Sequence, residues 1–102
     1  MKKITINGVA FVPSAVTFNV LCDMEEAGAP METWSKLDMG ILRAYLSACL
    51  GITPAEAGDM IGEHVVKGGN VNELREAFAE GLEESDFFKA LRNRKTANED
   101  AE

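Results

Sequence analysis

Asn7 and Gly8 are the residues that most constrain the fold, because they stand between two short runs of extended, β-type pattern. Both residue types tolerate the positive φ angles that a two-residue type I′ turn requires. The pattern therefore predicts a β-hairpin over residues 3–12 that ends at Pro13. Its apolar residues are Ile4, Ile6, Phe11 and Val12. A lone hairpin is marginally stable in water, so it must pack on helices or receive further strands.

After the hairpin the apolar residues recur at steps of three and four, which is the period of an α-helix. Residues that cap or break helices divide this part of the chain into four helices and a short fifth one. The predicted helices begin at Thr17, Asp38, Thr53, Asn70 and Ser85, and glycines at 28, 51 and 68–69 end the first three. Thr53 with Glu56, and Asn70 with Glu73, have the spacing of capping boxes. We expect the second helix to be the central one, and residues 28–37 to form a loop with one short helical turn.

The fold class predicted from this order is α+β and mostly helical, with an N-terminal β-hairpin followed by four or five amphipathic helices. A chain of 102 residues is long enough for one core, since a domain of this size buries roughly two-thirds of its unfolded surface. The apolar fraction of 46% and the charged fraction of 26% are those of ordinary globular domains. We expect a single domain over residues 1–94 and a polar, disordered tail over residues 95–102.

The charge balance disfavours two classes of partner. Seventeen acidic and ten basic residues give a net charge of −7, which opposes the attraction to phosphate that drives nucleic-acid binding. The same sign of charge repels anionic membrane surfaces. The N-terminus lacks the apolar run of a signal peptide, and no segment has the length of a transmembrane helix. We expect a cytoplasmic protein that binds neither nucleic acid nor membranes.

No constellation of residues points to catalysis, a cofactor or a metal. His64 is the only histidine, and Cys22 and Cys49 are too far apart for a CxxC motif. Two acidic runs, at residues 23–26 and 83–86, could in principle serve as acid and base or hold a hard cation, but charge runs at helix ends are usually solvated. The sequence therefore predicts a protein that is not an enzyme.

Several residues suit protein binding instead. Tryptophan and methionine are enriched at the centres of interfaces, and acidic side chains can meet basic residues of a partner. The candidate protein-binding residues are Glu25, Glu26, Met31, Trp34, Met39, Phe87 and Phe88. The alternative is that the apolar members of this set close a small core.

Residues 53–62 resemble the first helix and turn of a helix-turn-helix DNA-binding unit. That unit needs a second, basic helix to contact phosphates and bases. Here the next helix opens with Glu73, so it offers few donors for phosphate and base contacts. A small DNA-binding regulator is therefore the alternative function and ranks second.

Three segments together resemble the tail assembly chaperones of long-tailed bacteriophages and prophages: residues 17–28 (TFNVLCDMEEAG), 41–46 (ILRAYL) and 53–58 (TPAEAG). With the hairpin before them, the resemblance covers roughly residues 4–84. It implies a non-catalytic protein of the bacterial host cytoplasm that binds the tape measure protein, keeps it soluble and helps to recruit tail tube subunits. A homo-oligomer is a further possibility, since a short hairpin exposes an edge strand that could pair between subunits.

Overall fold

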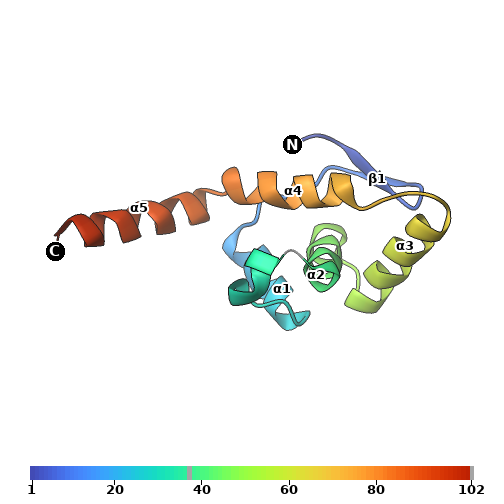
Figure 1. Ribbon diagram of the computed structural model, residues 1–102, viewed down its shortest axis with the longest axis horizontal. Helices are drawn as coiled ribbons and strands as arrows, with labels where there is room; N and C mark the ends of the chain where they lie inside the picture. Colours follow the sequence, from blue (N-terminus) through green and yellow to red (C-terminus); the bar gives the residue numbers. More distant parts are fainter. Residues whose placement is uncertain (37, 102) are drawn as a thin grey trace.

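The computed structural model describes residues 1–36 and 38–101, without the side chains of residues 95–101. Its elements are β1 (Ile4–Ile6), β2 (Val9–Phe11), α1 (Phe18–Glu26), the 3-10 helix η1 (Met31–Lys36), α2 (Met39–Leu50), α3 (Pro54–Val66), α4 (Asn72–Glu83) and α5 (Asp86–Ala101). Helices account for 66% of the structure, and the antiparallel hairpin precedes them (Figure 1). The predicted α+β, mostly helical fold is confirmed.

The hairpin turns at the two residues that the sequence indicates. Asn7 has a φ of 50° and Gly8 a φ of 79°, so both adopt the left-handed conformation of a type I′ turn. Ile4 lies opposite Phe11, and the side chain of Ile4 is buried. The backbone N–H of Asn7 donates a hydrogen bond of 2.9 Å to Nδ1 of His64 on α3. The hairpin therefore packs against helices of its own chain.

Helix α2 is the central element, as expected, because it packs against α1, α3 and α4. Its buried apolar residues are Ile41, Leu42, Ala44, Tyr45 and Leu46. The ring of Tyr45 lies edge-on to Phe78 of α4, with 5.1 Å between the ring centroids. The Tyr45 hydroxyl donates to the carbonyl oxygen of Ser14 at 2.6 Å, which ties the segment before α1 to the core.

Four of the predicted helix starts have the capping bonds that the sequence indicates, and at the last of them the side chain of Ser85 accepts a hydrogen bond of 3.3 Å from the backbone N–H of Phe88. The side chains of Thr17 and Asp38 accept hydrogen bonds from the backbone N–H groups three residues later. Thr53 forms a complete capping box with Glu56, and Pro54 occupies the first position of α3.

The predicted capping box at Asn70 and Glu73 is wrong. Helix α4 begins at Asn72, and the residue before it, Val71, gives no side-chain cap. Asn70 instead accepts a hydrogen bond of 3.0 Å from the backbone N–H of Asn72, which closes a local turn before the helix. Val71 is buried, so the core holds an apolar residue at the position where a polar cap would stand.

The helical period predicts that Phe18, Leu21 and Cys22 form the buried face of α1, and the observed face differs from this prediction. Val20, Leu21 and Met24 are buried, whereas Phe18, which has the spacing of the same stripe, is 56% exposed. Phe18 lies in the first turn of α1, where its ring meets the edge of Phe87 from α5 at 5.4 Å. Phe18 therefore packs against Phe87 of α5 at the surface and is not part of the core.

Helix α5 is longer than the short helix that the sequence predicts. It continues from Asp86 to Ala101 and shows no break at the expected start of a disordered tail at residue 95. The segment has neither glycine nor proline, the two residues that disfavour helix most strongly. Figure 1 shows α5 leading away from the other helices, which accounts for the elongated extents of 53 × 26 × 22 Å.

No helix in the described part of the chain combines the length and the apolar composition that crossing a bilayer requires.

Candidate protein-binding groove

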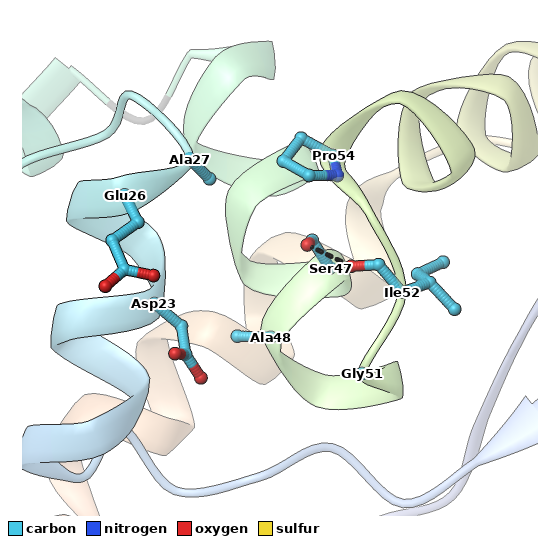
Figure 2. Close-up of a pocket in the computed structure, with 8 residues that line it drawn as sticks. All are labelled: Asp23, Glu26, Ala27, Ser47, Ala48, Gly51, Ile52 and Pro54. Carbon is cyan, nitrogen blue, oxygen red and sulfur yellow. Dashed lines mark hydrogen bonds between the residues drawn. The ribbon is translucent and has the colours of Figure 1, made fainter.

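An open groove of about 410 Å³ lies between the C-terminal half of α1 and the junction of α2 with α3 (Figure 2). We call it the α1–α2 groove. Its lining residues are Asp23, Glu26 and Ala27 from α1 and its end, Ser47, Ala48 and Gly51 from α2 and its end, and Ile52 and Pro54 from the start of α3. One wall is therefore acidic, and the opposite wall is mainly apolar.

The acidic wall follows from the way in which α1 packs. Val20, Leu21 and Met24 are the buried residues of this helix, which leaves Asp23 and Glu26, three positions apart, exposed beside the groove. Both carboxylates stand near the C-terminus of α1, where the helix dipole is also negative. No basic residue occupies the last turn of α1. The potential on this side of the groove is therefore negative.

The apolar wall follows from the sharp connection between α2 and α3. Gly51 ends α2 in the left-handed conformation, with a φ of 66°. The hydroxyl of Ser47 donates a hydrogen bond of 2.6 Å to the carbonyl oxygen of Ile52 and holds the connection against α2. Helix α3 begins directly after this connection, at Pro54, and the capping box of Thr53 and Glu56 stabilises its first turn. Ala48 and Pro54 consequently face the acidic wall, whereas Ile52 turns its carbonyl oxygen toward Ser47 and its side chain away from α1 (Figure 2).

This combination of walls suits a basic and partly apolar segment of another protein. Among the eight residues drawn in Figure 2, the bond between Ser47 and Ile52 is the one that is marked, so the carboxylates of Asp23 and Glu26 make no hydrogen bond with the other six. A lysine or arginine could lay its aliphatic stem on Ala48 and bring its charge to either carboxylate. Each such exposed ion pair stabilises by about 0.2–1 kcal/mol.

The predicted protein-binding residues are spread over several parts of the surface. Glu26 lines the α1–α2 groove, and its neighbour Glu25 is exposed without lining it. Met31 is 47% and Met39 is 50% exposed. Met39 lines a separate hollow of about 330 Å³ between α2 and α3, beside Arg43. The structure thus does not gather the candidate residues into one site.

The aromatic members of the predicted set belong to the packing of the core and its edge. Trp34 is 7% exposed, and its Nε1–H donates to the carbonyl oxygen of Ala29 at 2.9 Å. Its ring centroid lies 5.3 Å from that of Phe78 and 5.7 Å from that of Phe88. Phe87 and Phe88 are half-buried and fix the first turn of α5 against η1 and α1. A partner cannot reach Trp34 in this arrangement.

Sequence reasoning missed the apolar half of the groove, Ala48, Ile52 and Pro54. A signal was present, because a glycine that ends one helix and a threonine–proline pair that starts the next are separated by one residue. So short a link brings the ends of two helices together. It does not reveal that the end of α1 lies beside them.

Two groups on α2 have shifted pKa values, and burial is the main cause of both shifts. Burial, with a smaller effect of the neighbouring Cys49, raises the pKa of Tyr45 far above its usual value. Burial also raises the pKa of the Cys49 thiol, and hydrogen bonding to Ser14 and Tyr45 only partly offsets it. A nucleophilic thiol needs the opposite shift. Within the described residues, no three acidic, histidine or cysteine side chains are placed to hold a metal ion.

Comparison of the chain with protein-family models, with curated proteins and with solved structures found no match.

Proposed function

We propose that this chain is a non-catalytic, protein-binding domain that holds a basic, partly apolar segment of another protein in the α1–α2 groove. The observation that carries the proposal is the pairing of two exposed carboxylates, Asp23 and Glu26, with the apolar wall of Ala48 and Pro54. An amphipathic helix laid in a groove is a common mode of peptide recognition, and the two walls match its apolar and basic faces.

The partner that we propose is the tape measure protein of a long-tailed phage or prophage. Support for this identity comes from the resemblance of segments 17–28, 41–46 and 53–58 to tail assembly chaperones. In this role the chain shields the client in the bacterial host cytoplasm and helps to recruit tail tube subunits. A net charge of −7 suits a chaperone, because like charges on its copies oppose aggregation.

Co-expression with the tape measure protein of the same phage or prophage tests the proposal. We expect the wild-type chain to raise the soluble fraction of the client and to co-purify with it. D23K/E26K should lose both effects, because two attractions in the groove become repulsions. E73K/E76K is the matched control, since it reverses two exposed acids at the same spacing on α4. Rescue by D23K/E26K equal to that by the wild type would refute the groove as the binding site, and failure of the wild type would refute the chaperone function.

The DNA-binding alternative stays in second place. The helix that would contact DNA in a helix-turn-helix unit, α4, exposes Glu73, Glu76 and Glu83 and a single basic residue, Arg75. Phosphate contacts need basic side chains on that helix. No observation in the described residues favours this function.

A further inference from the structure

The charge of this chain is divided unevenly between its body and the first nine residues of its last helix. Residues 1–84 contain 13 acidic and 6 basic residues, whereas residues 86–94 contain one acidic and three basic residues. The basic residues of the second segment are Lys89, Arg92 and Arg94. The start of α5 is therefore a cationic segment attached to an anionic body.

This segment stands clear of the body. Phe87 and Phe88 fix the first turn of α5, and α5 then leads away from α1 and α2 (Figure 1). Every residue from 89 to 94 is exposed. Leu91, an apolar residue, is 40% exposed and lies one helical turn before Arg94, on the same side of the helix. The segment is thus both basic and partly apolar.

We propose that α5 of one copy of this chain docks in the α1–α2 groove of another copy, so that copies assemble head to tail. The basic residues of α5 meet Asp23 and Glu26, and Leu91 meets the apolar wall formed by Ala48 and Pro54. The inference rests on the groove as a docking site, as proposed above, but not on the identity of the tape measure protein.

The occupant is a second copy because α5 cannot reach the groove of its own chain. Figure 1 shows that α5 points away from the ends of α1 and α2 that form the groove. An interface between two different surfaces of the same chain does not close on itself as a two-fold dimer does. It gives rings or open chains of copies. One helix in one groove is a small interface, so the association should be weak and dependent on concentration.

Sedimentation velocity over a range of protein concentrations tests the proposal with two complementary variants. R92E/R94E reverses the charge of α5 and leaves the groove unchanged, whereas D23K/E26K reverses the charge of the groove and leaves α5 unchanged. The wild type should grow in average mass with concentration. Each variant alone should associate about tenfold more weakly or worse, because at least two attractive pairs become repulsive. Circular dichroism checks that each variant remains folded.

The mixture of the two variants is the decisive sample. The groove of R92E/R94E should accept the helix of D23K/E26K, and the reversed helix of R92E/R94E should meet the reversed groove of D23K/E26K, so the mixture should regain the association that each variant alone has lost. The chain with all four reversals should assemble again, with the charges exchanged. Association of D23K/E26K equal to that of the wild type, or a mixture that stays monomeric while the wild type assembles, would overturn the proposal. So would a wild type that stays monomeric at all concentrations.

The two proposals can fail separately. R92E/R94E retains the groove, so it should still keep the tape measure protein soluble. If the wild type does not bind the tape measure protein but the mixture of the two variants still associates, only the chaperone function is refuted. If a strictly monomeric wild type binds the tape measure protein, only the proposal of head-to-tail assembly is refuted.

Discussion

The hydroxyl of Tyr45 is a polar group inside the core, and its hydrogen bond is what makes that position favourable. The side chain is 0% exposed, and its hydroxyl donates to the carbonyl oxygen of Ser14. Tyr45→Phe leaves that carbonyl without its donor, so we expect the free energy of unfolding to fall by about 1–3 kcal/mol. Urea denaturation measures the loss. Ser35→Ala removes an exposed hydroxyl and should change the stability by less than about 0.5 kcal/mol. Equal effects of the two substitutions would contradict the role of the bond.

The same residue and its neighbour Cys49 make stability depend on pH in the alkaline range. Burial raises the pKa of both groups, so the folded chain keeps protons that the unfolded chain releases above about pH 8.5 for the thiol and about pH 10 for the phenol. The folded state then binds more protons, and the free energy of unfolding falls as the pH rises through this range. Denaturation at pH 7 and pH 10.5 measures the decrease. The Tyr45→Phe/Cys49→Ala chain should lose less stability over the same interval, and an equally steep decrease would show that other groups cause it.

At the scale of the elements, the threonine that caps α3 and the asparagine that precedes α4 offer a direct comparison. Thr53 closes a complete capping box on α3, whereas Asn70 closes only a turn ahead of α4. We expect Thr53→Ala to lower the free energy of unfolding by about 0.5–2 kcal/mol, because it leaves the Glu56 backbone N–H without its partner. Asn70→Ala should cost less, since α4 has no side-chain cap to lose. The thermal or urea transition of each chain measures this, and a larger loss from Asn70→Ala would refute the assignment.

The elements show which features of the fold follow from local sequence. The turn at Asn7 and Gly8 and the caps at Thr17, Asp38 and Thr53 depend on atoms a few residues apart, so residue types alone predict them. The exposure of Phe18 and the burial of Trp34 depend on where α5 and α4 cross the chain. No local pattern contains that information.

The candidate site was harder to predict than the fold for the same reason. Glu26 was predicted as a contact residue from its charge, but its groove exists because α2 brings the end of α1 beside the start of α3. Ala48 and Ile52 carry no chemical signal of binding. Ala48 matters for binding only because it faces two carboxylates, and Ile52 only because its carbonyl oxygen holds the connection to α3 against α2.

At the scale of the whole molecule, the stability of α5 is linked to assembly. Most of the stability of a protein helix comes from tertiary packing rather than from the helix alone, and α5 packs on the body chiefly through its first turn. The backbone of residues 89–94 should therefore open often in a single copy and seldom in a copy whose α5 lies in a groove.

Hydrogen exchange at low and high protein concentration measures this link. We expect the amides of residues 89–94 to exchange rapidly in dilute solution and to gain protection as the concentration rises, while the amides of α2 stay protected throughout. R92E/R94E should abolish the gain. Salt at about 0.5 M should reduce the gain, because the Debye length is then well below its value of about 10 Å at 0.1 M salt. The attraction between α5 and the groove is weakened accordingly. Protection of α5 that is the same at every concentration would mean that the helix is stable by itself, and it would remove the reason for α5 to need a partner.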